Sequence, residues 1–201
     1  MLRDCHTHNL ASTDGIISVN PDFNDFKPNK NYSCGIHPWT THQIENESTL
    51  FDQLEKTCSE KKIIALGEAG LDRLRGLPLS AQINIFIKQI ELSEKYELPI
   101  ILHCVKASSE LLQLKKKFNP RQPWIFHGFR GGFINARQLA NAGLYLSIGE
   151  KFNRDGIKGI PDDKLLVETD ESQLSIEEIA ARIGPDTLKI STYNLNNLLN
   201  N

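Results

Sequence analysis

KIIALGEAGLDRLRGLPLSAQINIFIKQIELSEKYELPIILH, residues 62–103, decides the fold. The segment opens with an apolar run at residues 62–68 and closes with another at residues 99–103, and both have the length and apolar character of buried strands. Between them, apolar residues recur at helical spacing over residues 80–96: Ile83, Phe86, Ile87, Ile90 and Leu92. Ser80 is the expected N-cap of that helix. This pattern predicts two parallel strands joined by a helical crossover.

Six further strand-like runs lie at residues 2–5, 15–19, 31–35, 123–128, 144–149 and 164–170. Amphipathic segments lie at residues 50–60, 108–118, 135–141 and 175–183, and a weak Asn-rich one begins at residue 187. Eight strands with helical crossovers predict the α/β class and a (β/α)8 TIM-type barrel. The first three strands are joined by connections too short and too rich in Asn, Pro and Asp for full helices, so we expect an abbreviated barrel.

The composition is typical of one globular domain, which we expect to span residues 1–201 without a repeat or linker. Hydrophobic residues make up 39% of the chain and charged residues 24%. No apolar run approaches the roughly 18 residues that a membrane-spanning helix needs, and Arg3, Asp4 and His6 stand where a signal peptide is apolar. We therefore expect a cytoplasmic protein.

The four cysteines and the overall charge exclude two classes of protein. Cys5, Cys34, Cys58 and Cys104 lack CxxC spacing, so we expect free thiols in a reducing compartment rather than a cysteine zinc site. The formal net charge of -2 and the pI of about 6.3 exclude the broad basic field of a non-specific nucleic-acid binder. Any polyanionic substrate must be held by local contacts.

Histidines and carboxylates accompany the carboxyl ends of the predicted strands: His6, His8, Glu68, His103, His127 and Asp170. Alternate residues of an extended chain point the same way, so His6 and His8 can hold one ion. Taken singly, each residue has an ordinary explanation, as a surface or core histidine or a helix-cap carboxylate. Because the strand ends of such a barrel form one rim, where its active sites lie, we predict that all six converge there as metal ligands.

The nitrogen and carboxylate ligands suit zinc, manganese, magnesium or iron. Six ligands exceed what one tetrahedral ion takes, so we predict two divalent ions, with Glu68 as the bridging carboxylate. Such ions polarise an ester or amide oxygen and lower the pKa of a bound water. Asp170 can be both a ligand and the base that accepts the water's proton, so Glu68 and Asp170 are the candidate catalytic residues.

The motifs DCHTH, GIHPW, GEAGLD, LHC, FHGF and ETD occur in this order, and together they resemble the TatD family of metal-dependent hydrolases and deoxyribonucleases. The likeness runs from Met1 to about Asp170. It implies a distorted (β/α)8 barrel and phosphodiester cleavage, chiefly of DNA from its ends, with divalent metal. It also implies that the six residues named above are the metal ligands.

Four side chains beside these motifs are candidates for substrate binding: His37, Arg73, Arg130 and Lys151. His37 precedes Pro38, which cannot extend a strand ladder, so we expect it on a rim loop, contacting the substrate or supporting the ligands. The three cations, with Arg75 near the first, could hold phosphate oxygens. The alternatives are loop packing for His37 and an ordinary solvated surface for the cations. We expect His42 at the surface.

Three departures from the family pattern affect the expected substrate site. Val105 stands where the family usually has an arginine, which removes or moves a phosphate contact. Glu171 and Ser172 replace the usual Ala-Pro, and the added negative charge disfavours a nearby polyanion. The first helix and much of the C-terminal helical region are shortened or absent.

The leading prediction is a metal-dependent phosphodiesterase or deoxyribonuclease acting on DNA ends or on a small phosphodiester. The alternative is an amidohydrolase-like enzyme for a small ester, amide or lactone, because the same metal site supports acyl chemistry. A weaker alternative is a non-catalytic metal-binding protein. Neither a membrane nor an obligate protein partner is expected.

Overall fold

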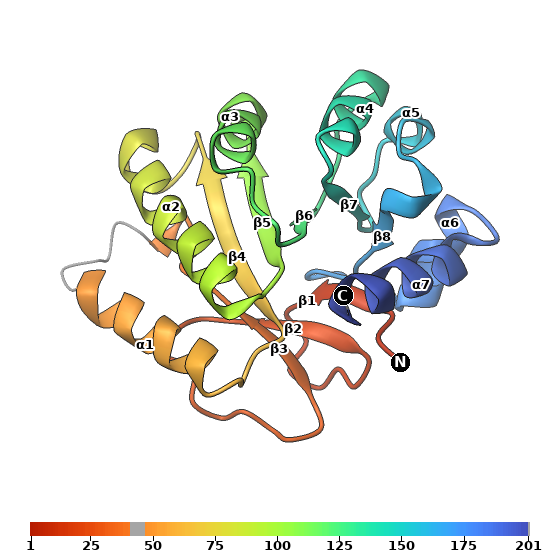
Figure 1. Ribbon diagram of the computed structural model, residues 1–201. Helices are drawn as coiled ribbons and strands as arrows, with labels where there is room; N and C mark the ends of the chain where they lie inside the picture. The colour runs from red at the N-terminus through yellow and green to blue at the C-terminus, as the bar shows by residue number, and fades with distance from the viewer. Residues whose placement is uncertain (41–46, 201) are drawn as a thin grey trace. The chain divides into compact units, whose positions relative to one another are not determined.

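The computed structural model describes residues 1–40 and 47–200, which form two compact units (Figure 1). The terminal unit consists of Met1–Ile17 and Pro123–Asn201, and the central unit of Ser18–Gln122. The strands are β1 (Asp4–Thr7), β2 (Gly15–Val19), β3 (Asn31–Cys34), β4 (Ala65–Asp72), β5 (Ile100–Val105), β6 (Trp124–Phe126), β7 (Tyr145–Ile148) and β8 (Leu165–Val167).

The helices alternate with the strands from β3 onward. They are α1 (Glu47–Ser59), α2 (Leu79–Tyr96), α3 (Ser108–Phe118), α4 (Phe133–Asn141), α5 (Arg154–Lys158), the 3-10 turn η2 (Asp162–Lys164), α6 (Ile176–Ile183) and α7 (Thr187–Asn200). Eight parallel strands with intervening helices confirm the predicted class, an abbreviated (β/α)8 barrel of the TIM type. No helix precedes β3 in the described part of the chain, which agrees with the short connections expected there.

In the central unit, β3, β4 and β5 pair in parallel, and α2 packs on β4 (Figure 1). The helix buries Ile85, Phe86 and Ile90 toward the strands. The same face also buries the polar side chains of Gln82 and Gln89. Buried polar groups need hydrogen-bond partners, so these two glutamines mark a structured polar contact beneath the helix.

In the terminal unit, β6, β7 and β8 pair in parallel, and β1 pairs with the start of β2. An isolated parallel bridge joins Thr7 to Asp170, so the end of β1 lies beside the segment that follows β8. Helix α4 packs on β7, and α6 and α7 pack on β8 (Figure 1). All residues of β8 are buried, and so are all residues of β7 after the first. This burial agrees with the apolar runs in their sequences.

Several predicted strand boundaries are wrong: β6 and β8 are shorter than predicted, whereas β4 and β5 are longer. Strand β4 continues to Asp72 and β5 to Val105, so Glu68 and His103 lie within strands rather than at their ends. Gly70 pairs with His103 and Asp72 with Val105, which extends the ladder through the polar motif. His6 likewise lies within β1. Apolar runs show only the buried part of a strand, whereas backbone pairing sets its end.

The helix predictions differ in smaller ways. Helix α3 has the predicted bounds, and α1, α2, α4 and α6 differ by a few residues. Pro78, not Ser80, is the N-cap residue of α2, as suits a proline-restricted backbone at a helix start. The short α5 was not predicted, since five residues are too few to show a period. The predicted surface residue His42 lies outside the described residues, and the described helices include none long and apolar enough to cross a membrane.

Candidate metal centres

The terminal unit brings together four of the six predicted ligands: His6, His8, His127 and Asp170. Backbone pairing places three of them. The amide of His8 donates to the carbonyl oxygen of Asp170 at 3.1 Å, and the amide of Asp170 donates to the carbonyl oxygen of His6 at 3.0 Å. These hydrogen bonds hold the end of β1 against the segment after β8, and the three side chains gather there.

The side-chain geometry of this terminal cluster suits a shared cation. Asp170 Oδ1 lies 3.7 Å from Nε2 of His6 and 3.7 Å from Nε2 of His8. The rings of His6 and His127 are 4.5 Å apart, and one ligand atom each of His6, His127 and Asp170 lies within 4.8 Å of the others. Ligands on a tetrahedral ion with bonds of about 2.1 Å are themselves about 3.4 Å apart. The cluster therefore has the spacing of a metal site.

Two buried carboxylates lie behind the terminal cluster. Asp4 accepts hydrogen bonds from the amide and hydroxyl of Thr169, at 3.0 and 2.6 Å, and another from the amide of His6 at 3.3 Å. Burial raises the pKa of Asp4 to about 6, although the hydrogen bonds from Thr169 oppose that rise. Asp4 thus joins β1 to the residue next to Asp170, which gives the first residue of the D-x-H-x-H motif a structural role.

Glu168 is the second of these carboxylates, and its side chain is fully buried. Its Oε1 accepts a hydrogen bond from the amide of Gly128 at 2.7 Å and lies 3.4 Å from Nδ1 of His127. Metal-bound histidines commonly present their second ring nitrogen to a carboxylate in this way. Burial, followed by the charge of Glu168, raises the pKa of the neighbouring Cys5 thiol well above its ordinary value. The Cys5 thiol donates a hydrogen bond to the hydroxyl of Ser147 at 2.9 Å.

The central unit brings together the other two predicted ligands, Glu68 and His103, and places His37 beside them. Glu68 Oε1 lies 3.7 Å from Nδ1 of His103 and 3.7 Å from Nε2 of His37. One ligand atom from each residue lies within 4.8 Å of the others. Each unit thus contains a carboxylate oxygen at the same distance from two imidazole nitrogens.

His103 has a carboxylate partner of its own. Its Nε2 lies 3.1 Å from Oδ2 of Asp72, which is 2% exposed. The same oxygen accepts a hydrogen bond from the indole nitrogen of Trp39 at 2.5 Å. Burial raises the pKa of Asp72, but the hydrogen bonds from Trp39, Leu74 and His103 outweigh burial and leave the pKa below its ordinary value. The ionised Asp72 keeps the proton on Nε2 of His103 and leaves the Nδ1 lone pair toward Glu68.

His37 has the opposite arrangement. Its Nδ1 accepts a hydrogen bond from the amide of Trp39 at 3.0 Å, so this nitrogen carries no proton. In the neutral ring the proton then lies on Nε2, which faces Glu68. A protonated nitrogen is a hydrogen-bond donor rather than a ligand. The geometry therefore supports His37 as a donor beside the cluster, in line with the sequence-based expectation.

Two buried glutamines of α2 fix the loops that carry this central cluster. The side chain of Gln89 accepts from the amide of Ile36 at 2.7 Å and donates to its carbonyl oxygen at 3.1 Å, just before His37. The side chain of Gln82 accepts from the amide of Asp72 at 2.7 Å and donates to its carbonyl oxygen at 2.8 Å. Neither glutamine was predicted from the sequence, although two glutamines seven positions apart on an apolar helix face were a usable signal.

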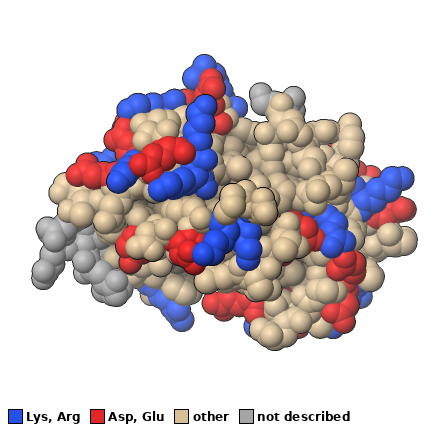
Figure 2. All heavy atoms as spheres, turned by 90° about the horizontal axis from the view of Figure 1, so that it is seen from below, with Lys and Arg blue, Asp and Glu red and all other residues tan. Residues whose placement is uncertain are grey.

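The three predicted cationic contacts have different surroundings. The guanidinium of Arg73 donates from Nε to the carbonyl oxygen of Lys106 at 3.0 Å and pairs with Glu110 at 2.5 Å. Arg130 and Lys151 are exposed, and neither has an ion-pair partner among the described residues. Figure 2 shows basic and acidic side chains interspersed over the face in view. That face carries no broad positive field.

A hollow of about 880 Å³ opens beside the terminal cluster. His8 and Asp170 line it, together with the β1–β2 loop and the segment from Thr169 to Glu178. Its lining is rich in acidic and hydroxyl side chains, and its one basic residue, Arg3, pairs with Asp14 at 2.5 Å and also with Glu177. The hollow is large enough for a nucleotide-sized ligand, but its arginine is already paired with two carboxylates.

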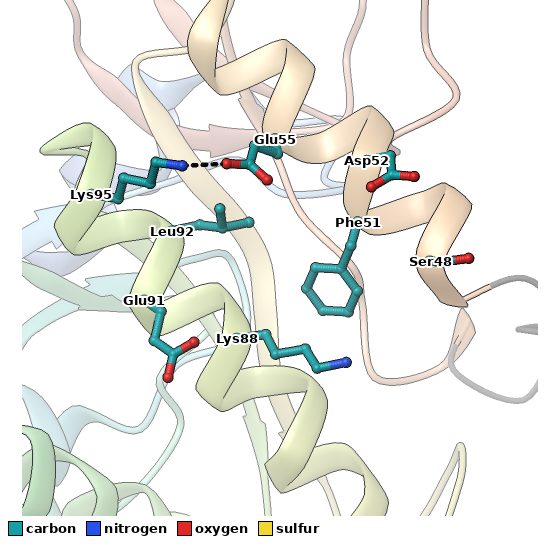
Figure 3. A pocket seen from close by; sticks show the side chains of 8 residues that line it. All are labelled: Ser48, Phe51, Asp52, Glu55, Lys88, Glu91, Leu92 and Lys95. Atoms are coloured by element: carbon teal, nitrogen blue, oxygen red, sulfur yellow. Dashed lines mark hydrogen bonds and ion pairs between the residues drawn. The ribbon is translucent and has the colours of Figure 1, made fainter.

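A smaller groove of about 330 Å³ lies between α1 and α2 in the central unit (Figure 3). Across the groove, the amine of Lys95 forms an ion pair with the carboxylate of Glu55 at 2.5 Å. The amine of Lys88 lies 4.9 Å from the centre of the Phe51 ring. These contacts are ordinary packing between two surface helices. The groove contains none of the predicted site residues.

Comparisons with known proteins agree with this geometry. The model of the TatD related DNase family matches residues 23–199. A putative deoxyribonuclease TATDN1 homolog from Enterocytozoon bieneusi is 34% identical over 68% of this chain and 54% of its own length. A 3'-5' ssDNA/RNA exonuclease TatD from Cronobacter sakazakii is 32% identical over 75% of this chain and 60% of its own length.

A solved structure, that of the TATD homolog YJJV from Escherichia coli K12, shares the fold with a TM-score of 0.75. It is 21% identical and covers 91% of this chain and 83% of its own. The chain spans 54% to 60% of the length of the curated relatives named above. The family model covers most of the chain and contains residues of both clusters, so the chain belongs to the TatD related DNase family.

Proposed function

We propose that this protein is a metal-dependent phosphodiesterase that cleaves nucleic acid from its ends. The observation that carries the proposal is the pair of clusters, in each of which one carboxylate oxygen lies 3.7 Å from two imidazole nitrogens. The names of the two curated relatives, a deoxyribonuclease and an ssDNA/RNA exonuclease, support the substrate class. Metal dependence agrees with other relatives named as metal-dependent hydrolases.

The donor sets fit two divalent ions, one on each cluster, and the mixture of nitrogen and oxygen ligands suits zinc, manganese or magnesium. In the terminal cluster, His6, His8, His127 and Asp170 would hold the ion. In the central cluster, His103 offers Nδ1 and Glu68 offers its carboxylate. Bound ions of this kind supply an acidified water and neutralise charge on a phosphoryl oxygen.

The protein's own side chains have separate roles in this proposal. Asp170 orients the attacking water and accepts its proton, because its carboxylate is partly exposed and borders the hollow. His37, whose Nε2 faces Glu68 at 3.7 Å, orients that carboxylate. Glu68 is 7% exposed, so an ion that it would hold is shielded from bulk water. Arg130 and Lys151 remain candidate contacts to more distant phosphates.

Three further features of the proposal follow from the sequence. Cys5, Cys34, Cys58 and Cys104 are free thiols, which supports a reducing compartment such as the cytoplasm. The absence of a broad positive face in view favours short or single-stranded ends over long duplex DNA. No obligate protein partner is required by the two clusters, since each is built within one unit.

The test is hydrolysis of end-labelled single-stranded DNA, RNA and a small phosphodiester with Mg²⁺, Mn²⁺ or Zn²⁺. We expect Glu68→Gln to lower kcat at least about 100-fold and to lose bound metal, because an amide is a weak ligand. Glu91→Gln is the matched control, since that exposed carboxylate on α2 lies outside both clusters, and it should retain metal and rate. Full activity and full metal content in the Glu68 variant contradict the proposal.

The acidic hollow beside Asp170 favours one other candidate function, hydrolysis of a small neutral ester, amide or lactone. A negatively charged lining repels a polyanion but accepts a neutral or cationic group. If the protein hydrolyses acyl substrates but cleaves no phosphodiester in the same assay, acyl hydrolysis replaces phosphodiester cleavage as the proposed function.

A further inference from the structure

Arg75 and Trp39 form a stacked pair in the central unit. The guanidinium carbon of Arg75 lies 4.4 Å from the centre of the Trp39 ring. A stacked guanidinium uses its face for the aromatic contact, so its in-plane N–H donors stay directed outward. Both side chains are exposed, Trp39 to 39%, and they are accessible to a ligand.

The pair is attached to the central cluster through Trp39. The indole nitrogen of Trp39 donates to Asp72, and the Trp39 ring centre lies 5.3 Å from that of His103. The His37 ring lies 4.9 Å from the Trp39 ring. One aromatic side chain therefore contacts the predicted metal ligand, the neighbouring hydrogen-bond donor and the cation.

The backbone of Arg75 is also fixed. Its amide donates to Oδ1 of Asp72 at 3.2 Å, and its carbonyl oxygen accepts from Nε2 of Gln82 at 2.8 Å. The Asp72 carboxylate thus binds His103 through one oxygen and the loop that carries Arg75 through the other. A cation held in this way loses little conformational entropy when it binds an anion.

The charge of Arg75 is not neutralised within the described residues, which offer it no carboxylate at ion-pair distance. Arg73, two residues earlier on the same loop, differs in this respect, because Glu110 and the carbonyl oxygen of Lys106 occupy its guanidinium. The two arginines have the same charge and both are exposed, but among the described residues only Arg73 is paired with a carboxylate. Arg73 was predicted from the sequence as a phosphate contact, whereas the contacts in the structure favour Arg75 for that role.

We propose that Arg75, held on Trp39, binds a phosphate group of the substrate next to the one being cleaved. The proposal rests on the phosphodiesterase function proposed above and adds the residue that recognises the anion. It also supplies a local phosphate contact in a chain whose net charge is -2. Charge-assisted hydrogen bonds from a preorganised guanidinium are the expected means of recognition.

The test compares Arg75→Ala with Arg73→Ala in the full chain, with folding checked by circular dichroism and thermal unfolding. Steady-state hydrolysis of a short single-stranded DNA should show KM raised about tenfold or more by Arg75→Ala, with kcat within about twofold. Arg73→Ala should leave both constants within about twofold of the original protein. Arg75→Lys should be intermediate, because lysine keeps the charge but loses the planar stacked fork.

A second measurement does not depend on catalysis. Fluorescence anisotropy with the same labelled DNA, in the presence of a chelator, gives Kd over a series of salt concentrations. Arg75→Ala should weaken binding by about the same factor as it raises KM and reduce the salt slope by about one. Trp39→Leu should weaken binding less than Arg75→Ala, since it removes the support but keeps the charge.

The outcomes separate the two proposals. If the original protein cleaves DNA but Arg75→Ala and Arg73→Ala behave alike in KM, Kd and salt slope, Arg75 is not the phosphate contact and the phosphodiesterase proposal stands. Arg75→Ala lowering kcat alone likewise overturns the assignment. If the original protein neither binds nor cleaves DNA, both proposals fail together.

Discussion

The two clusters fix their ligands by different physical means. In the terminal unit, backbone hydrogen bonds between His6, His8 and Asp170 bring the side chains together, so the pairing of β1 with the segment after β8 builds the site. In the central unit, side chains from α2 hold the loops, through Gln82 and Gln89. A backbone ladder resists single side-chain changes, whereas a side-chain clamp depends on individual residues.

The two clusters also differ in the histidine ring nitrogen that faces the supporting carboxylate. His103 has Asp72 at 3.1 Å from Nε2, whereas His127 has Glu168 at 3.4 Å from Nδ1. The two rings therefore present opposite nitrogens to their cluster partners. A histidine found in the sequence therefore does not tell which of its ring nitrogens binds a metal. The carboxylate that contacts the other nitrogen determines this.

The largest effect should come from the close approach of strands in the central unit. A Cβ on Gly70 would lie 2.1 Å from the carbonyl oxygen of His103, and its φ of +140° is unfavourable for other residues. We expect Gly70→Ala to lower the free energy of unfolding by about 3 kcal/mol or more, measured by urea denaturation.

Gly149 in the terminal unit is the matched control for that substitution. A Cβ there would meet Glu168 atoms at 3.6 Å, an ordinary van der Waals distance. Gly149→Ala should change the free energy of unfolding by less than about 1 kcal/mol. Equal destabilisation by both substitutions would contradict the difference in packing between these two positions.

The next effect concerns the carboxylates behind the histidines. Asp72→Asn keeps the shape but removes the charge that holds the proton on Nε2 of His103, so metal affinity should fall about 10- to 100-fold. Glu168→Gln should lower metal affinity less, because the Glu168 oxygen lies farther from the His127 ring than the Asp72 oxygen lies from the His103 ring. Isothermal titration with Zn²⁺ on the metal-free protein measures both. A greater loss for the Glu168 variant reverses the proposed order.

The smallest effect tests the glutamine clamp. Gln89→Ala leaves the buried amide and carbonyl of Ile36 without their partner, which should lower the free energy of unfolding by about 1 to 3 kcal/mol. Thr169→Val in the terminal unit removes the hydroxyl contacts to Asp4 and Thr7, whereas the backbone amide bond to Asp4 remains. Its cost should be about 1 kcal/mol. A larger cost at Thr169, measured by urea denaturation, would show that side chains hold the terminal unit too.

Much of the fold was predictable because buried parallel strands are continuous apolar runs. The order of strands and helices from residue 62 onward followed from that pattern, and α3 has the predicted bounds. The strand ends were not predictable, since β4 continues through Glu68 and Gly70 to Asp72 by pairing with β5. Polar residues in a paired strand look like a loop when only composition is read.

The candidate ligands were predictable as residue types from their side-chain chemistry. Within the terminal unit the structure brings together His6, His8, His127 and Asp170, and within the central unit Glu68 and His103. That all six hold a pair of ions remains a prediction. The roles of Asp72, Glu168 and the two glutamines were missed, because a hydrogen-bond partner far away in the sequence leaves no local pattern.

By itself, the sequence determined the fold class, the ligand types and the family resemblance, because hydrophobic periodicity and residue chemistry are local properties of the chain. Only the tertiary structure decided which nitrogen of each histidine faces its cluster and which of the two arginines pairs with a carboxylate. Those outcomes depend on contacts such as Asp72 with His103 and Glu110 with Arg73, which form when distant segments pack together. The direction of a side chain is set by its neighbours in space.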